Sequence, residues 1–189
     1  DRRQRQMCIR DSTNKAKNNK ELKLFKRLLK FVKSGGTAVY LDRLTDSVKT
    51  ENTITPFTAR VHPSKGLWTC IPHIAMEHPI LEGLQNSGFL RNSYENIWPK
   101  KSLRDLKVNG VKVTEKPLVA SIAFDWFSRG HKMGYSGPGP SWWGADMTFV
   151  PFKEGEYLLS QFELLENLGK DPVADKMLFN IITYCITKD

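Results

Sequence analysis

The stretch LLKFVKSGGTAVYL, residues 28–41, decides the fold. Apolar residues recur at helical spacing up to Val32, with basic residues on the other side, which predicts a helix from about Asn19. Ser34-Gly35-Gly36 ends that helix, because glycine readily adopts the left-handed backbone of a helix C-terminus. Residues 37–41 then predict a short strand that is apolar on both faces. Such strands are typical of a parallel sheet covered by helices, so the stretch predicts an α/β fold.

The end of the chain repeats this pairing of a buried strand with a helix. Glu154-Gly155 predicts a turn, and residues 157–162 predict a strand that is apolar on both faces. Asp171 before Pro172 predicts a helix start, because aspartate accepts bonds from free N–H groups and proline lacks an N–H. The helix that follows carries one apolar stripe, made of Ala174, Met177, Leu178, Ile181, Ile182 and Cys185.

The middle of the chain gives weaker signals. Val108–Val113 predicts a tight hairpin, since Asn-Gly suits a type I′ turn. Leu118–Phe127 predicts another strand. Ser128–Phe152 contains five glycines and three prolines, and we therefore expect no long regular element there.

Charge is distributed unevenly along the chain. The 189 residues include 29 Lys and Arg against 20 Asp and Glu, a net charge of +9. Residues 1–33 hold twelve basic and three acidic residues, whereas residues 34–189 hold seventeen of each. Because a nucleic-acid-binding face spreads its basic residues over the folded body, we expect no nucleic-acid partner. No apolar run is long enough to span a membrane, so we expect no membrane span.

Residues 1–12 show no pattern that predicts a helix or a strand of the fold. Residues 7–12, MCIRDS, resemble a translated sequencing linker of metagenomic assemblies. We therefore expect residues 1–12 to be a non-native or disordered leader and residues 13–189 to form one domain. On this interpretation the chain is an N-terminally truncated fragment, and the strand that should precede the first helix is missing.

Few residues carry a recognisable chemical motif. The carboxylate pairs Asp171/Asp175 and Glu163/Glu166 suit a helix start and a surface turn better than acid–base catalysis. The three cysteines, Cys8, Cys70 and Cys185, are too few and too far apart for a disulfide framework or a zinc module. The four histidines, His62, His73, His78 and His131, match no metal-ligand spacing. We expect no catalytic residue, no metal and no cofactor, with a reactive Cys70 as an open alternative.

The aromatic segment 128–152 offers the one candidate binding site. Its candidate sugar contacts are Arg129, Tyr135, Trp142, Trp143 and Asp146. Aromatic rings stack on sugars, while charged side chains bond to sugar hydroxyls. The alternative is that the rings cover one end of the sheet or pack against a neighbouring domain.

Two blocks resemble a known family. Residues 28–41 are similar to the helix–strand "FV-xx-GGT-xx-xL" of domains related to class I glutamine amidotransferases, and residues 78–84, HPILEGL, resemble their "HP-xx-GL" connector. Residues 135–146, and residues 161–184 with their NLGKDPVAD core, resemble the closing half of such domains at the C-terminal end of bacterial glycoside hydrolases similar to family 2. The resemblance runs from about residue 20 to residue 187.

The resemblance implies a flavodoxin-like α/β sandwich with a mostly parallel sheet, incomplete at its N-terminal end, like the trimerisation domain of some β-galactosidases. The amidotransferase nucleophile motif G-x-C-x-G and the His-x-Glu pair do not occur here. The resemblance, without these motifs, therefore implies a non-catalytic accessory domain of a β-galactosidase- or β-mannosidase-type hydrolase. The implied partners are an upstream catalytic domain of the same polypeptide or a sister subunit, in the periplasm or outside the cell. The alternative function is a glycan-binding module that uses Tyr135, Trp142 and Trp143.

Overall fold

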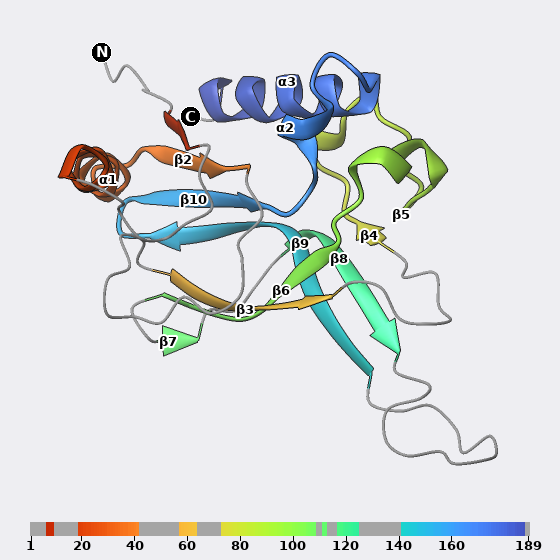
Figure 1. Cartoon of the computed structure of the whole chain (residues 1–189), viewed down its shortest axis with the longest axis horizontal. Coiled ribbons are helices and arrows are strands. Elements are labelled where there is room, and N and C mark those ends of the chain that lie inside the picture. Colours follow the sequence, from red (N-terminus) through yellow and green to blue (C-terminus); the bar gives the residue numbers. More distant parts are fainter. Residues whose placement is uncertain are drawn as a thin grey trace.

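The computed structural model describes residues 7–9, 19–41, 57–63, 73–108, 111–112, 117–124 and 141–187. Among these residues ten strands form one mixed sheet, and helices pack against it (Figure 1). Along its main path the strand order is β1-β2-β10-β9-β8-β4-β5. The α/β class expected from residues 28–41 is confirmed.

The first part of the sheet is the parallel half. It consists of β1 (Met7–Ile9), β2 (Thr37–Tyr40) and β10 (Gly155–Ser160), with β2 parallel to both neighbours. Helix α1 (Asn19–Lys33) precedes β2, and Gly35, two residues after its end, has a φ of +102°. The predicted helix, glycine stop and buried strand are therefore confirmed.

Strand β1 lies in a segment for which the sequence predicts no strand. Met7 pairs with Ala38 and Ile9 with Tyr40, so β1 supplies the parallel strand before α1 that was predicted to be missing. Residues 1–6 and 10–12 of the leader lie outside the described residues. Whether the leader is native stays a prediction.

The rest of the main path is the antiparallel half. It consists of β9 (Ser141–Phe152), β8 (Pro117–Phe124), β4 (His73–Ala75) and β5 (Phe89–Leu90). Each pairing within it, and that of β9 with β10, is antiparallel. The expectation of a mostly parallel sheet is therefore wrong. Only two residues separate β9 from β10, and so short a turn can join only antiparallel strands. The buried strand at residues 37–41 indicates a parallel sheet, but its parallel pairing extends only as far as β10.

The sheet forks at β9. On one edge of β9 lies β8, and on the other edge lies β10, which pairs with residues 147–152. Past that point Leu103 of β6 (Lys101–Val108) pairs with Ala145 of β9. Strands β3 (Phe57–Pro63) and β7 (Val111–Lys112) flank β6 on this second branch. The β6–β7 pairing confirms the predicted hairpin, whose Asn-Gly turn lies outside the described residues.

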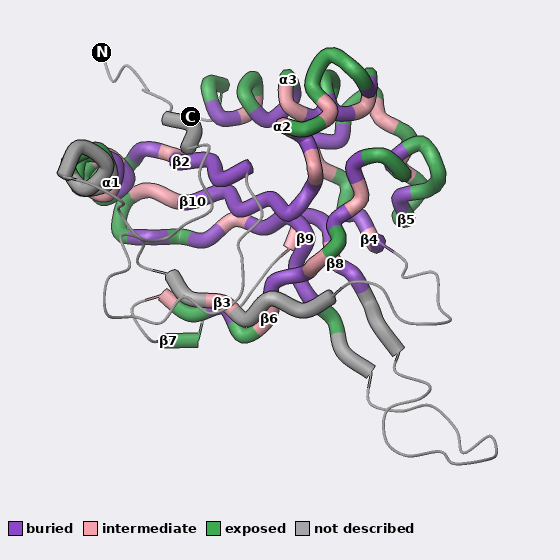
Figure 2. Tube along the Cα trace, in the orientation of Figure 1, coloured by how far each residue is buried: buried purple, intermediate pink, exposed green. Residues whose placement is uncertain are grey.

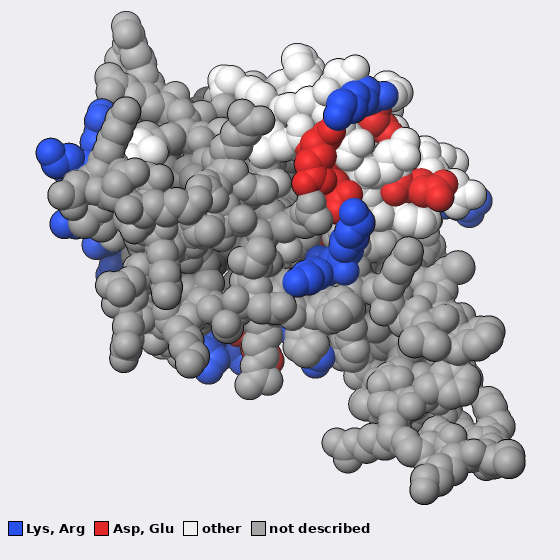
Figure 3. All heavy atoms as spheres, in the orientation of Figure 1, with Lys and Arg blue, Asp and Glu red and all other residues white. Residues whose placement is uncertain are grey.

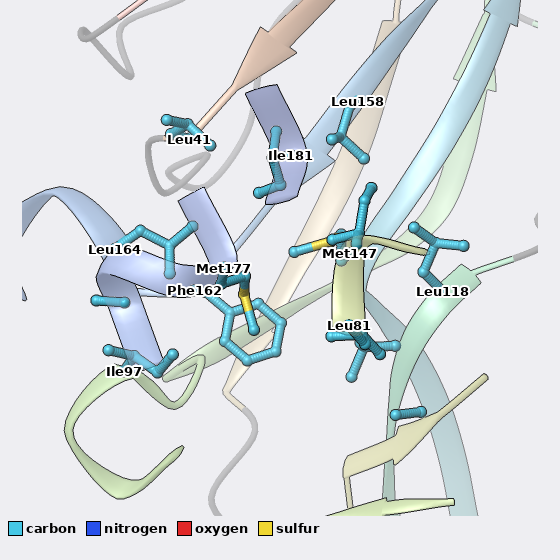
Figure 4. Close-up of a cluster of buried hydrophobic side chains, with 14 of the residues drawn as sticks. Leu41, Leu81, Ile97, Leu118, Met147, Leu158, Phe162, Leu164, Met177 and Ile181 are labelled. Carbon is cyan, nitrogen blue, oxygen red and sulfur yellow. The ribbon is translucent and has the colours of Figure 1, made fainter. Parts of the chain in front are cut away.

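Apolar residues fill a separate core on each face of the sheet. Val39 of β2 and Leu158 of β10 face one core, while Ala38 and Leu159 face the other. The first core is covered by η2 (Pro79–Leu81), η3 (Asn92–Ile97), α2 (Leu164–Asn167) and α3 (Pro172–Thr187). Figure 4 shows side chains of this core. The second core lies between the sheet, α1 and β6, and both cores appear as buried segments in Figure 2.

The expectation that residues 128–152 hold no long regular element is wrong for their second part. Residues 141–152 form β9, the longest strand of the described part of the chain. Gly144 lies within this strand, where β6 approaches closely. A Cβ at this position would lie 2.7 Å from the Cβ of Ser102 and 3.0 Å from the carbonyl oxygen of Leu103, so only glycine fits. Residues 128–140 lie outside the described residues.

Candidate functional site

Four polar side chains meet inside the sheet at its fork. His73 comes from β4, Ser102 from β6, Ser121 from β8 and Asp146 from β9. His73 is 5% exposed and the other three are 0% exposed. We call this group the polar node. Buried polar groups need partners of their own, and here the node supplies them.

Asp146 is the acceptor at the centre of the polar node. Its Oδ1 accepts a hydrogen bond from Ser102 Oγ at 2.8 Å, and its Oδ2 accepts one from Ser121 Oγ at 2.6 Å. His73 Nδ1 also lies 2.8 Å from Oδ2. An ionised carboxylate can only accept, so this contact requires the proton on Nδ1. These three bonds hold the Asp146 carboxylate in place inside the sheet.

A bulge in β9 places Asp146 in the polar node. Val119 pairs with Met147 and the next residue of β8, Ala120, pairs with Ala145, so Asp146 has no residue of β8 opposite it. A bulge of this kind re-aims a side chain. The Asp146 carbonyl oxygen accepts a bond from the N–H of Gln161 at 2.8 Å, just after β10 ends. Asp146 is thereby bonded to residues of both branches of the fork.

The polar node contains the residue types of a serine hydrolase, but not its geometry. In such an enzyme the serine contacts one ring nitrogen of the histidine and the aspartate contacts the other. Here Ser121 Oγ lies 3.1 Å from His73 Nδ1, the same nitrogen that faces Asp146. Ser121 also has no exposed surface. The arrangement is suited to joining four strands rather than to attacking a substrate.

The candidate sugar contacts are not brought together among the described residues. Trp143 is 49% exposed on β9, whereas Asp146 is fully buried and does not fit a surface contact. Only the backbone of Trp142 is described, where it pairs with Ala123. Arg129 and Tyr135 lie outside the described residues. Sugar binding by Trp143 and its neighbours stays a prediction.

The carboxylate pairs have structural partners. Asp171 Oδ1 accepts bonds from the N–H groups of Val173 and Ala174, as its predicted helix-capping role requires. The bond from Asn96 Nδ2 at 2.8 Å, followed by these backbone bonds, holds the pKa of Asp171 below its usual range despite burial. Asp175 accepts the N–H of Gly169, and Glu163 forms an ion pair with Lys100 at 2.8 Å.

The remaining chemical candidates give no site in the described part of the chain. No group of three or more His, Cys, Asp or Glu side chains is arranged to hold a metal ion within the residues described. Cys185 is buried, and Cys70 lies outside the described residues. Among the described helices, none is long and apolar enough to cross a membrane.

Sequence reasoning missed the polar node as a unit. A signal was present, because Asp146 lies between Ala145 and Met147 in a run that is otherwise apolar. A charged residue in a buried strand indicates a polar partner. Its partners lie 25 to 73 residues away along the chain, so spacing alone does not identify them.

Helix α3 has a second apolar side. Its inner side carries the buried residues Ala174, Met177, Ile181 and Cys185. On the outer side Phe179 is 62% exposed, Ile182 44% and Ile186 56%. These three residues are spaced three and four apart and form one stripe, which we call the α3 ridge.

Comparison with known proteins gives likenesses of structure only. No family model matches the chain, and no curated protein matches its sequence. The solved structures similar to it include a cold-adapted β-galactosidase from Rahnella sp. R3, with 10% identity over 84% of this chain and a TM-score of 0.40. A β-galactosidase from Bacillus circulans sp. alkalophilus is also similar, with 10% identity over 85% of this chain and a TM-score of 0.36. The chain spans 20% of the length of each of these two proteins.

Proposed function

We propose that this chain is an accessory domain of a carbohydrate-active glycoside hydrolase, which packs against a catalytic domain or a sister subunit. The α3 ridge is the observation that carries the proposal. A helix with one packed side ordinarily presents polar residues on its other side. Phe179 and Ile186 instead expose more than half of their surface. Exposed apolar stripes of this kind are typical of protein–protein contacts.

Two further observations support this role. Residues 28–41 resemble domains related to class I glutamine amidotransferases, and residues 135–146 and 161–184 resemble the closing half of such domains at the C-terminal end of bacterial glycoside hydrolases. This resemblance supports a partner upstream in the same polypeptide or in a sister subunit. The polar node is sealed in the sheet, with Ser102, Ser121 and Asp146 at 0% exposure. Such burial suits residues that maintain architecture better than residues that contact a substrate.

The first experiment is long-read sequencing of the gene upstream of the codon for Asp1. The proposal expects the frame to continue into a barrel with paired glutamates. In that full-length enzyme, removing residues 13–189 should lower oligomer size or the melting temperature more than kcat. A truncated enzyme that stays an intact oligomer of normal stability would contradict the proposal.

The ridge itself is tested in the same enzyme by Phe179→Ser with Ile186→Ser. Because these side chains are exposed, the expected loss is in domain or subunit association, measured by analytical ultracentrifugation, with kcat retained. Thr183→Ser, on the exposed part of the same helix, is the matched control. Equal association of the ridge variant and the control would overturn the role of the ridge.

A second candidate function is glycan binding through Tyr135, Trp142 and Trp143. The 49% exposure of Trp143 favours it, because an exposed ring on a strand offers a stacking platform. Tryptophan fluorescence titrated with galactosides, mannosides and plant polysaccharides tests it, with Trp143→Ala as the variant. No shift at millimolar sugar in the unmodified chain would exclude this function.

A further inference from the structure

Helix α1 presents a strongly basic side at the edge of the molecule. Its inner residues Leu28 and Val32 are 2% and 0% exposed in the second core. Among the side chains that the structure describes on α1, five exposed basic residues lie on its outer side, namely Lys23, Lys26, Arg27, Lys30 and Lys33. Figure 3 shows Lys and Arg side chains at the edge where Figure 1 places α1. We call these five residues the α1 basic stripe.

The α1 basic stripe has no acidic counterpart among the described side chains of its helix. Solvent-facing helices ordinarily mix signs, so that acids and bases three or four residues apart attract each other. In the stripe neighbours such as Lys23 and Arg27 carry like charges and repel. Within the described residues no ion pair joins any of the five to a carboxylate. This local conflict indicates that the stripe is kept for an external partner.

The basic charge of the stripe is not shared by the rest of the protein. Residues 34–189 hold equal numbers of basic and acidic residues. The positive excess of the chain therefore lies in residues 1–33, which include α1, and it gives this edge a positive field. Such a field orients the molecule toward an anionic surface.

The side chains of the stripe favour a plane of anionic headgroups over nucleic acid. Four of the five are lysines, which act as long, flexible point charges. Among the exposed side chains that the structure describes on α1, none is an aromatic ring that could stack on a base or an amide that could read one. Leu24, 42% exposed on the same helix, can enter the headgroup region, whereas it has no role against a phosphate backbone.

We propose that the α1 basic stripe binds the surface of a bilayer rich in anionic phospholipids. The contact is peripheral, because the apolar side of α1 is already packed in the second core. Clusters of four to eight basic residues on a helix bind such surfaces through electrostatic attraction. The role is independent of the α3 ridge, which lies on a different helix.

The test is co-sedimentation of the full chain with vesicles of phosphatidylcholine, with and without about 30% phosphatidylglycerol. We expect binding only to the anionic vesicles, and its loss at about 0.5 M salt, where screening shortens the reach of charge. Lys26→Gln with Lys30→Gln should weaken binding about 30-fold, from the loss of two basic residues near the surface. Both positions are exposed, so circular dichroism should show an unchanged fold.

The matched control is Lys107→Gln with Lys112→Gln, which removes the same charge from exposed positions of β6 and β7. The control should bind within about twofold of the unmodified chain, since its lysines lie off α1. Equal weakening of both variants, or no weakening of the α1 variant, would overturn the proposal. Tighter binding to duplex DNA than to anionic vesicles, lost in the α1 variant, would overturn it in favour of nucleic acid.

Discussion

The parallel and antiparallel halves of the sheet are held together in different ways. In the parallel half, β2 and β10 bury apolar residues on both faces, and neighbouring residues of the sequence start and stop each element. In the antiparallel half, β4, β8 and β9 meet β6 around a buried carboxylate. The first half depends on apolar surface and turn residues, whereas the second depends on a few polar contacts between distant segments. The two halves should therefore fail under different substitutions.

The largest expected effect is at the centre of the antiparallel half. Asp146→Ala leaves the donors of Ser102, Ser121 and His73 buried without their acceptor. Because each buried donor left without an acceptor costs about 1–3 kcal/mol, we expect a loss of about 3 kcal/mol or more in the free energy of unfolding, measured by urea denaturation. Asp146→Asn should cost about 1–3 kcal/mol, because it keeps one acceptor oxygen.

The control for Asp146 is Glu77→Ala, at an exposed position just after β4, where we expect a change within about 0.5 kcal/mol. An Asp146→Ala protein as stable as this control would show that apolar packing alone holds the fork. The two halves would then not differ in the way described.

The next largest effect is expected where the backbone of a glycine lies close to other atoms, at Gly155 in the parallel half and at Gly144 in the antiparallel half. In the parallel half a Cβ at Gly155 would collide with the carbonyl oxygens of Val32 and Gly36. In the antiparallel half a Cβ at Gly144 would lie 2.7 Å from the Cβ of Ser102. The contacts at Gly155 are closer than those at Gly144, and both sites include a backbone carbonyl oxygen. Gly155→Ala should therefore cost about 3 kcal/mol and Gly144→Ala about 1–2 kcal/mol. Thermal and urea unfolding measure both.

Gly169→Asn serves as the control for these glycines. Its φ is +69°, which asparagine tolerates, and a Cβ at this position would have no atom within 4 Å. We expect little change in stability. If Gly144→Ala proves the more costly substitution, the tighter contact lies at the fork and not where α1 meets β10.

The sequence predicts the parallel half better than the antiparallel half, and the reason is physical. Gly35 and the residues around it set α1 and β2 through contacts within a few positions of the chain. Strand β9 is not expected from the sequence, because Gly144 indicates a break in regular structure. Only the structure shows that Gly144 is needed there for the close approach of Ser102 of β6. The polar node joins β4, β6, β8 and β9, and none of its bonds is local. Distance along the chain, rather than a lack of signal, limits the prediction.

Buried tyrosines give a smaller effect at high pH. Burial raises the pKa of Tyr94 to about 12, and its Oη donates to the carbonyl oxygen of Gln85 at 2.9 Å. Burial also raises the pKa of Tyr40 and Tyr157 in the parallel half. The unfolded chain therefore loses these protons first, and the free energy of unfolding falls as the pH rises above about 10.

Replacing single tyrosines tests this pH dependence. Tyr94→Phe should reduce the slope of stability against pH by about 1.4 kcal/mol per unit between pH 10 and 12. Tyr157→Phe should reduce it in the same direction. Urea unfolding from pH 9 to 12 measures both, and a slope unchanged by both variants would contradict the assignment.

The smallest effect concerns Asp171. Unlike the role of Asp146, the helix-capping role of Asp171 is predicted from the sequence. Both aspartates are buried, but Asp171 bonds to the N–H groups of Val173 and Ala174, two and three residues away. Asp171→Ala should cost about 1 kcal/mol, the usual loss for a helix cap. Asp171→Asn should cost only a few tenths, because asparagine also caps helices.

The pH dependence distinguishes a cap from a general packing defect. The folded-state pKa of Asp171 is lowered, chiefly by the bond from Asn96, so its contribution is present above the ordinary pKa of aspartate, about 3.9. As the pH falls through that value toward the lowered one, the contribution is lost. The stability difference between the unmodified chain and Asp171→Ala should therefore shrink at acid pH. A difference that stays constant down to about pH 2 would mean that the carboxylate charge adds nothing and that Asp171 stabilises α3 through packing alone.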